Sequence, residues 1–359
     1  MGEGTRAPSG IRLVQPYAIA LLCGGGRASR LAGRGGVLRL RSEGQLCYGP
    51  HPGPVSIWAD DEHAKDGEMT AAVLGVIGGS GVYDLPGLED VREEAVSSPW
   101  GQPSDALRIG RIGETRIVFL ARHGRGHRLS PTGIDYRANI DALKRAGVTD
   151  IVSLSACGSF REELPPGLFV LVDQFVDRTH GRASSFFGNG CVAHVSMAHP
   201  VGPRLQDRIA AAAKAEDIAV VRGGTYVCME GPQFSSLAES RAYKAQGFDV
   251  IGMTNMPEAK LAREAEITYA TIAMVTDFDC WHPGHDAVDV AAVVAVARAN
   301  ADKAARLVAR LARDFPQTRE PCPAGSHRAL DGAIMTAPAA RDPALMAKLD
   351  AVAGRVLAG

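Results

Sequence analysis

The sequence has few cysteines, no long apolar run and almost no net charge, and each absence excludes a class of protein. Its seven cysteines are odd in number and none lies in a C-x-x-C pair, which argues against a disulfide framework or a structural zinc site and favours a reducing, cytoplasmic compartment. No apolar run approaches the roughly 18 residues of a membrane span. The formal net charge of -1 gives nucleic acid no general attraction. We therefore expect no metal, no nucleic-acid partner and no membrane partner.

The remaining composition is ordinary for a globular protein, with 46% apolar and 22% charged residues in 359. The chain divides into three parts by composition. Residues 1–68 are rich in Gly, Arg, Ala and Pro, residues 69–316 alternate apolar runs with helical stretches, and residues 317–359 follow a proline-containing break. Residues 69–316 are long enough for a single large core.

The first part, residues 1–68, has two explanations. Met69 is the first methionine after Met1 and stands just before the first convincing strand, so Met69 can be the true start. Alternatively, the Arg-rich, acid-poor composition up to about Ile57 is that of a targeting extension, although no clean amphipathic helix accompanies it. In either case we expect this part to be disordered or weakly structured.

The middle part has the pattern of an α/β domain. Short apolar runs predict buried strands: Val73–Ile77, Ile117–Leu120, Ile151–Leu154, Leu168–Val172, Val250–Met253 and Tyr269–Val275. Helices are predicted between and after them: Asp135–Ala146, with Gly147 suited to its end, Pro203–Ala215, Ser235–Gln246 and Val288–Phe315.

The last part, residues 317–359, contains one predicted helix, Asp342–Leu357, with Leu345, Leu349, Val352 and Val356 on one face. That apolar face predicts a packing partner but does not say which one. The helix either packs on its own domain or forms an arm that contacts another subunit.

Polar or small residues follow five of the predicted strands at the point where each strand ends. They are Gly78-Gly79-Ser80-Gly81, Arg122-His123-Gly124, Ser155-Ala156-Cys157-Gly158-Ser159, Thr254-Asn255 and Thr276-Asp277-Phe278-Asp279. Ligands of open α/β sheets bind outside the carboxyl ends of the strands. These segments therefore predict one ligand site.

Two kinds of group in these segments indicate a phosphate. The glycine-rich turn directs backbone N–H groups toward an anion, and the Ser80 hydroxyl adds a donor. Arg122 offers a planar fork for two phosphate oxygens, and Ser155 and Thr254 offer neutral donors. Taken alone, Arg122 and His123 could also be a surface charge pair, but the joint pattern disfavours that explanation.

Asp277 and Asp279 form the last group. Alternate residues of an extended chain point the same way, so both carboxylates can face one ligand. A helix N-cap and a metal site are the alternatives. The metal site is disfavoured because no His or Cys cluster accompanies the pair at ligand spacing.

Six motifs, in this order, resemble those of the 5′-methylthioadenosine phosphorylases, which belong to the trimeric purine nucleoside phosphorylase family. The motifs are Gly78–Gly81, Ala121–Arg125, Ser155–Ser159, Glu230–Phe234, Met253-Thr254 and Thr276–Trp281. The resemblance extends from about residue 73 to about residue 316. The first motif usually carries Thr where this chain has Ser80, and both residues supply a hydroxyl.

The resemblance implies an α/β fold with a central mixed sheet flanked by helices, a homotrimer, and active sites near subunit interfaces. It assigns phosphate binding to Ser80, Arg122, His123, Ser155, the Ala156 backbone and Thr254, and nucleoside binding to Phe234, Ser235, Met253, Val290 and His194. Met253 would lie along the ribose, Phe234 would stack on the base, and His194 would reach in from the neighbouring subunit. Simpler explanations are a helix-core position for Val290 and an ordinary, partly buried histidine for His194.

The implied reaction is phosphorolysis of S-methyl-5′-thioadenosine to adenine and 5-methylthioribose 1-phosphate, in the context of purine and methionine salvage. A protonated Asp277, its pKa raised by burial and by Asp279, would assist the leaving purine at N7 while Asp279 accepts from the 6-amino group; the two roles can also be reversed. Phosphate is a co-substrate, and no metal or organic cofactor is needed.

The nearest alternative is a phosphorylase for 6-oxopurine nucleosides such as inosine, guanosine or methylthioinosine. Those enzymes carry Glu where this chain has Ser235 and Asn where it has Asp277, so Ser235 with Asp277 favours a 6-aminopurine. A hydrolytic nucleosidase and a non-catalytic nucleotide-binding protein are more distant alternatives.

Overall fold

The computed structural model describes residues 70–79, 85–283 and 290–357. All of them belong to the second of the two units into which the chain divides, Lys65–Gly359. The predicted extension 1–68 and the phosphate-site residue Ser80 lie outside the described residues, and Val290 is described by its backbone alone.

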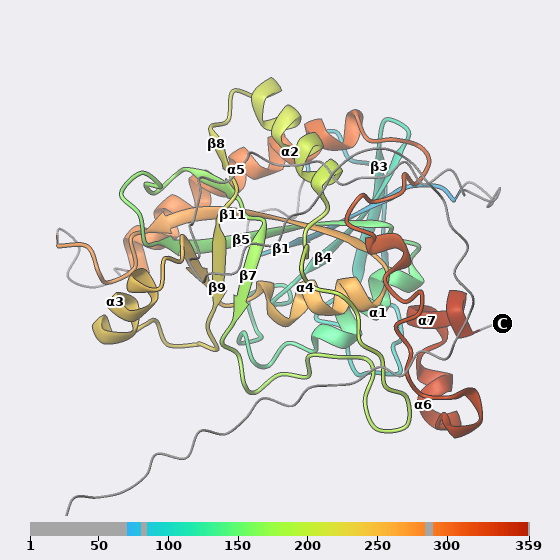
Figure 1. Cartoon of the computed structure of the whole chain (residues 1–359). Helices are drawn as coiled ribbons and strands as arrows, with labels where there is room; N and C mark the ends of the chain where they lie inside the picture. The colour runs from blue at the N-terminus through green and yellow to red at the C-terminus, as the bar shows by residue number, and fades with distance from the viewer. Residues whose placement is uncertain (1–69, 80–84, 284–289, 358–359) are drawn as a thin grey trace, which may run out of the picture. The chain divides into compact units, whose positions relative to one another are not determined.

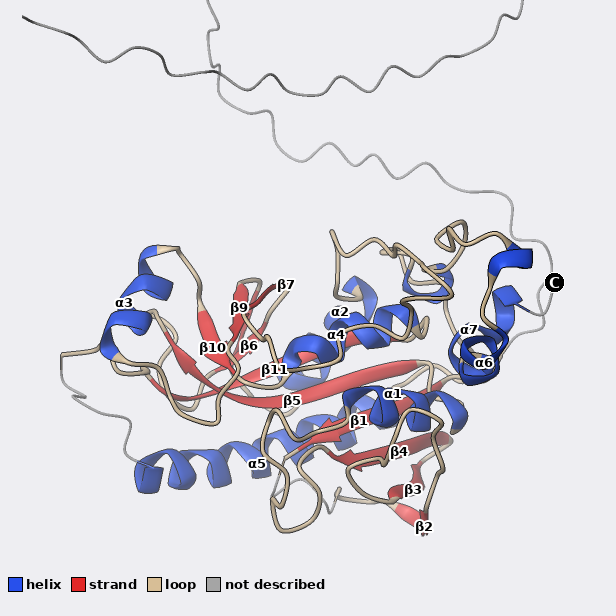
Figure 2. Cartoon of the chain, turned by 90° about the horizontal axis from the view of Figure 1, so that it is seen from below, coloured by secondary structure: helices blue, strands red, loops and turns tan. Residues whose placement is uncertain are grey.

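The centre of the fold is a mixed sheet, which confirms the predicted fold class (Figures 1 and 2). Its main strand order is β2-β3-β4-β1-β5-β10-β9-β7, while β11 pairs with β5 and β6, and β6 pairs with β8. The strands are β1 Val73–Gly78, β2 Glu89–Glu94, β3 Leu107–Ile112, β4 Thr115–Ala121, β5 Asp150–Ser159, β6 Phe169–Leu171, β7 Gln174–Asp177, β8 Val220–Arg222, β9 Thr225–Cys228, β10 Val250–Gly252 and β11 Thr268–Asp277.

Strands β4, β1, β5 and β11 run parallel to one another, so their carboxyl ends meet at one edge of the sheet. Strand β10 pairs with the last residues of β5 in the opposite direction. The described polar segments 122–124, 155–159, 254–255 and 276–279 therefore lie at this edge.

Helices cover both faces of the sheet, which explains why the strands appear in the sequence as continuous apolar runs. Along β1, Val73 and Ile77 join the core that contains α1 and α4, while Leu74 and Val76 join the core that contains α2 and α5. The helices are α1 Tyr136–Arg145, α2 Pro203–Ala215, α3 Leu237–Ala245, α4 Asn255–Glu264, α5 Val290–Arg313, α6 Pro343–Lys348 and α7 Asp350–Leu357.

All six predicted strands and the helices of the middle part are present, with ends that shift by up to a few residues. At α1, the Asp135 side chain accepts from the Ala138 N–H, and Gly147 has a φ of 82°. The first two residues of the predicted helix Val288–Phe315 lie outside the described residues. Sequence patterns missed β3, β7, β8 and β9, as well as β2, whose residues are all exposed. They also missed α4, which is interrupted at Met256 and contains Pro257.

The C-terminal part packs on its own domain. The predicted helix is broken at Leu349 into α6 and α7, and Leu349 and Val352 are buried in the core that contains α1. The Arg145 guanidinium pairs with the Asp350 carboxylate. The apolar face of the predicted helix therefore packs, at Leu349 and Val352, on the chain's own domain.

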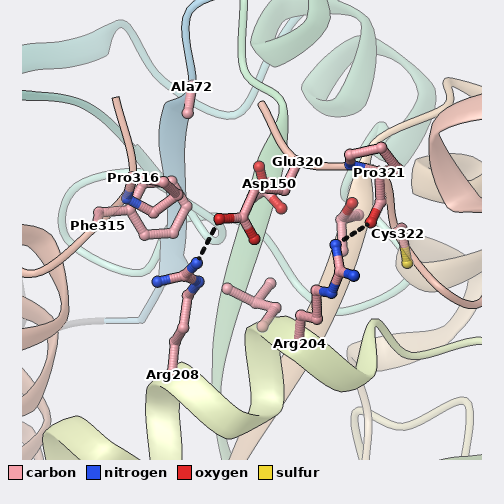
Figure 3. Close-up of a pocket in the computed structure, with 11 residues that line it drawn as sticks. Ala72, Asp150, Arg204, Arg208, Phe315, Pro316, Glu320, Pro321 and Cys322 are labelled. Carbon is pink, nitrogen blue, oxygen red and sulfur yellow. Dashed lines mark hydrogen bonds and ion pairs between the residues drawn. The ribbon is translucent and has the colours of Figure 1, made fainter. Parts of the chain in front are cut away.

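The start of this C-terminal part crosses the sheet at the amino ends of the strands. Figure 3 shows the cavity there, where Ala72, Asp150 and Thr268 precede or begin β1, β5 and β11. Arg208 of α2 pairs with Glu320 at 2.9 Å, and neighbouring Arg204 donates to the Pro321 carbonyl, also at 2.9 Å. This cavity lies at the edge opposite the predicted ligand site. Its two arginines bind the C-terminal part to α2.

Candidate active site

The predicted site is built around the end of β5. Residues Ser155 to Gly158 pair with β11 on one side, and Gly158 and Ser159 pair with β10 on the other. Ala156 is the one exposed residue of this otherwise buried strand, so a solvent-facing opening reaches the strand at that point. Strand β11 has a bulge between Val275 and Asp277, after which Asp277 lies opposite Gly158. A bulge re-aims the side chains that follow it, and this one brings the acidic end of β11 to the same opening.

Ser155 and Thr254 meet on the floor of the opening. Their hydroxyl oxygens are 3.4 Å apart, and the Ser155 hydroxyl is 3.0 Å from that of Tyr226. Both side chains are buried, and Thr254 stands at the N-cap of α4. A pair of hydroxyls beside a helix N-terminus is a suitable environment for an anion.

Arg122 contacts β5 directly before Ser155, and it is buried rather than a surface charge. Its guanidinium donates from Nε and Nη2 to the Glu258 carboxylate, at 2.8 and 3.1 Å. It also donates to the Leu154 carbonyl at 2.9 Å and to the Ser153 hydroxyl at 2.6 Å. Burial opposes the charged form, but the Glu258 carboxylate holds the pKa of Arg122 above its usual value. The fork that the sequence suggested for phosphate is occupied by Glu258 in this structure.

His123 is buried next to Arg122 and is held in one orientation. Its Nδ1 lies 2.9 Å from the Leu129 carbonyl, and its ring stacks on His127 with centroids 4.1 Å apart. A carbonyl only accepts, so Nδ1 carries a proton. Burial, together with the positive charge of Arg122, lowers the pKa of His123 to about 4. The ring is therefore neutral at pH 7, with Nε2 unprotonated.

Asp277 and Asp279 form a compact pair. The Asp277 carboxylate accepts from the Asp279 backbone N–H at 2.7 Å and lies 2.7 Å from the Thr276 hydroxyl. Gly158 leaves room for them, because a Cβ at that residue would stand 2.9 Å from an Asp277 oxygen. Burial raises the pKa of Asp279 most, and the charge of Asp277 adds to that increase, which the Ser240 hydroxyl offsets only in part.

Asp279 is 4% exposed, and its Oδ2 is buried with no hydrogen-bond partner. Such an atom favours either a proton on the carboxyl group or a donor from a ligand. Of the alternatives left open by the sequence, an N-cap does not fit, because residues 280–283 form turns. Within the described part of the chain no group of His, Cys, Asp and Glu is arranged to hold a metal ion.

The segment that carries Phe234 and Ser235 lies against the acidic pair. Ser235 is half-buried, its carbonyl lies 3.4 Å from the Cys280 thiol, and its side chain influences the pKa of Asp279. Phe234 is 48% exposed, so its ring can stack on a bound base. Met253 is half-buried and close to this segment, because a Cβ on Gly231 would meet the Met253 sulfur at 2.5 Å.

Two of the predicted nucleoside residues are not in this group. Val290 is the first residue of α5, and His194 is exposed on an extended segment. The His194 backbone N–H donates to Ala333, and the Met335 N–H donates to Val192. The segment that carries His194 is thus hydrogen-bonded to the C-terminal part of the chain.

Two charged residues of the site were missed by the sequence patterns. Glu258 lies in α4 and accepts from Arg122 and from the hydroxyls of Ser153 and Tyr269. Arg182 belongs to a loop, yet its side chain is only 1% exposed. Glu258 follows Met253-Thr254 by a few residues, which was a usable signal, whereas nothing in the sequence around Arg182 distinguishes it.

Comparison with known proteins agrees with this geometry. The sequence model of the phosphorylase superfamily matches residues 73–313, so the chain belongs to that superfamily. The S-methyl-5′-thioadenosine phosphorylase of Bradyrhizobium diazoefficiens is 73% identical over 291 residues, which cover 81% of this chain and 100% of that protein. The phosphorylase of the same name from Cereibacter sphaeroides is 63% identical over 80% of this chain and 99% of its own length.

Solved structures give the same result. A methylthioadenosine phosphorylase from an antarctic soil metagenomic library is 45% identical with a TM-score of 0.72, over 79% of this chain and 99% of that chain. A variant of the Schistosoma mansoni adenosine/methylthioadenosine phosphorylase, in complex with methylthioadenosine, is 37% identical with a TM-score of 0.63, over 67% and 91%. Within the superfamily, the chain is a member of the S-methyl-5′-thioadenosine phosphorylases, which confirms the resemblance drawn from its motifs. None of the described helices is long and apolar enough to cross a membrane.

Proposed function

We propose that the chain catalyses the phosphorolysis of S-methyl-5′-thioadenosine to adenine and 5-methylthioribose 1-phosphate. One observation carries this proposal: a hydroxyl pair suited to an anion and a carboxylate pair suited to a purine lie beside the same stretch of β5, residues 155–158. Ser155 belongs to the first pair, and Gly158 makes room for the second. The high identity to phosphorylases of this name supports the choice of substrate.

In the proposed reaction, the C1′–N9 bond of the nucleoside breaks and a phosphate oxygen bonds to C1′. We assign the hydroxyls of Ser155 and Thr254 to phosphate oxygens, together with Ser80 and the Ala156 backbone N–H. The unprotonated Nε2 of His123 can accept from a protonated phosphate oxygen. Arg122 contributes its positive charge, steadied by Glu258. The protein's part on this side is to position the nucleophile and to hold its charge.

On the base side, the departing purine gains electron density and needs a proton or a strong donor at N7. A protonated carboxyl group of the Asp277–Asp279 pair supplies that donor, and the other carboxylate accepts from the 6-amino group. The raised pKa of Asp279 supports a shared proton in this pair. Phe234 stacks on the base, and Met253 lies along the ribose.

The same pair supports a 6-aminopurine over a 6-oxopurine. A 6-oxopurine carries N1–H, which needs an acceptor, and the half-buried Ser235 hydroxyl is a weaker acceptor than a carboxylate. A buried polar group left without a partner costs about 1–3 kcal/mol. We therefore expect methylthioadenosine and adenosine to be cleaved faster than inosine.

The deciding experiment measures base release from methylthioadenosine, adenosine and inosine, with and without phosphate. We expect release from methylthioadenosine that depends on phosphate, and weak release from inosine. Faster cleavage of inosine would overturn the substrate assignment, and release that is unaffected by removing phosphate would indicate a nucleosidase instead. The same assay after dialysis against a chelator tests our expectation that no metal or organic cofactor is needed.

We further propose a homotrimer in which His194 reaches the 5′ end of the nucleoside bound by a neighbouring subunit. Support comes from an exposed apolar pair beside His194, formed by Met335 at 65% and Val192 at 39% exposure. Val290 would line the 5′ pocket as well. The test is the mass of the native protein in solution: a trimer is expected, and a Met335→Asp variant that weakens it would support this face as the contact.

The proposed setting is a cytoplasmic enzyme of purine and methionine salvage. The free, reduced state of the described cysteines Cys157, Cys191, Cys228, Cys280 and Cys322 is compatible with that compartment. Fractionation of cells that express the tagged chain tests the location, and accumulation of methylthioadenosine after loss of the gene tests the pathway.

A further inference from the structure

Four chain segments meet at one buried side chain, that of Arg182, near the ends of β9 and β10. Its Nη1 donates to the carbonyls of Met253 at 2.6 Å and Met256 at 2.7 Å. Its Nη2 donates to the Glu230 carbonyl at 2.6 Å. Its Nη1 also lies 3.0 Å from the Tyr136 hydroxyl. A guanidinium group with five N–H donors in one plane is suited to join several carbonyls in this way.

Glu230 strengthens the junction from the other side. Its carboxylate accepts from the Arg182 Nε at 3.2 Å, from the backbone N–H groups of His180 at 2.6 Å and Gly181 at 3.1 Å, and from the Thr132 hydroxyl. Burial alone would raise the pKa of Glu230, but these donors and the Arg182 charge lower it to about 2. The pair therefore stays ionised throughout the working pH range.

This junction joins two segments of the proposed active site, so we expect it to affect catalysis as well as stability. Met253 directly precedes Thr254, which we assign to phosphate, and Glu230 begins the segment that carries Phe234 and Ser235, which we assign to the base. Both segments follow neighbouring parallel strands, β10 and β9. The Arg182 guanidinium joins the main chain of one segment to the main chain of the other.

We propose that Arg182, paired with Glu230, is a positioning residue that fixes the phosphate segment 253–256 relative to the base segment 229–235. It touches neither reactant. It determines how far the phosphate oxygen stands from C1′ once both reactants are bound. This inference rests on the proposed phosphorolysis for its kinetic consequence.

The test is Arg182→Lys, which keeps the charge but cannot reach four acceptors. The side chains that bind phosphate and nucleoside are unchanged in this variant, so both KM values should stay within about threefold of the parent. A misplacement near 1 Å can cost about 100-fold in rate, so kcat should fall roughly 10- to 100-fold. In contrast, Thr254→Val should raise mainly the KM for phosphate, and Phe234→Ala mainly the KM for the nucleoside.

Arg263→Lys is the matched control. Arg263 is also buried and donates to the Ala324 carbonyl and the Ser326 hydroxyl, but it joins α4 to the C-terminal part. This variant should lower the melting temperature without changing kcat. A kcat for Arg182→Lys within twofold of the parent, or an equal loss in Arg263→Lys, would overturn the proposal. If Arg182→Lys does not fold, Glu230→Gln takes its place with the same expectations.

Hydrogen exchange separates this inference from the proposed function. Peptides from segments 229–235 and 253–256 should both exchange faster in Arg182→Lys than in the parent and in Arg263→Lys. If the parent releases no base in the presence of phosphate, the proposed function fails, and the exchange result alone judges the junction. Unchanged exchange in both segments would overturn it.

Discussion

Arg122 and Glu258 form an ion pair whose side chains are each 2% exposed, with two hydrogen bonds between guanidinium and carboxylate. The pair contacts β5 at Ser153 and Leu154, directly before Ser155, which we assign to phosphate. Taking two charges out of water is costly, and only their mutual contact and further hydrogen bonds offset that cost. Each partner therefore depends on the other.

The first prediction concerns the stability of this pair. Glu258→Met should lower the free energy of unfolding by about 3–5 kcal/mol, because it leaves the Arg122 charge buried and uncompensated. The double variant Arg122→Met, Glu258→Met should lose less than either single variant. Urea unfolding at pH 7 measures all three. Additive losses in the double variant would show that the two charges do not depend on each other.

The second prediction concerns pH. His123 has a pKa near 4 in the folded protein and an ordinary value of 6.5 when unfolded. Between those values the unfolded chain takes up a proton that the folded chain does not, so stability should fall as pH decreases from about 6.5 to 4. His123→Asn, which retains a donor for the Leu129 carbonyl, should reduce this decline. The exposed His194→Asn is the control and should leave the decline unchanged.

The sequence predicts best those features that depend on residues close together in the chain. The strands and their polar ends were predictable because a buried apolar run and the residue that ends it are neighbours in the chain. Asp277, Ser155 and Thr254 were placed correctly at one sheet edge for this reason. The fold class follows from the same alternation of strands and helices.

Pairings between distant residues could not be predicted in this way. Arg122 and Glu258 are 136 positions apart, so Arg122 looked like a free fork in the sequence. Arg182 lies in a small-residue loop that resembles a surface segment, and only the folded chain surrounds it with carbonyls. The helix predicted over Asp342–Leu357 is interrupted because Leu349 turns inward to the core, a tertiary effect that helical periodicity does not contain.

The third prediction separates stability from activity at Asp279. This side chain is buried, its Oδ2 lacks a hydrogen-bond partner, and it lies beside the charge of Asp277. Asp279→Asn removes that unfavourable charge, so the melting temperature should stay the same or rise, while kcat/KM for methylthioadenosine should fall by roughly 100-fold or more.

Asp249→Asn is a control for this variant. Asp249 pairs with Arg161 at 2.8 Å and accepts from the Thr225 N–H at 2.7 Å. It begins the approach to β10 at the other end of that strand. Its loss should lower stability with little effect on kcat/KM. An Asp279→Asn variant that melts several degrees below the parent would contradict the idea that the Asp279 charge lowers stability and is kept because activity needs it.

The fourth prediction exchanges the preferred base. In the double variant Ser235→Glu, Asp277→Asn, the new carboxylate can accept from the N1–H of a 6-oxopurine, and it stands near the N-terminus of α3, where negative charge is favoured. Giving such a buried group a hydrogen-bond partner, or removing that partner, changes the free energy of binding by about 1–3 kcal/mol. The ratio of kcat/KM for inosine to that for adenosine should therefore rise roughly tenfold or more.

The single variant Asp277→Asn should lower both values without inverting their order. A double variant whose ratio equals that of the parent would show that residues 235 and 277 do not select the base in this chain, and that the preference arises elsewhere in the pocket.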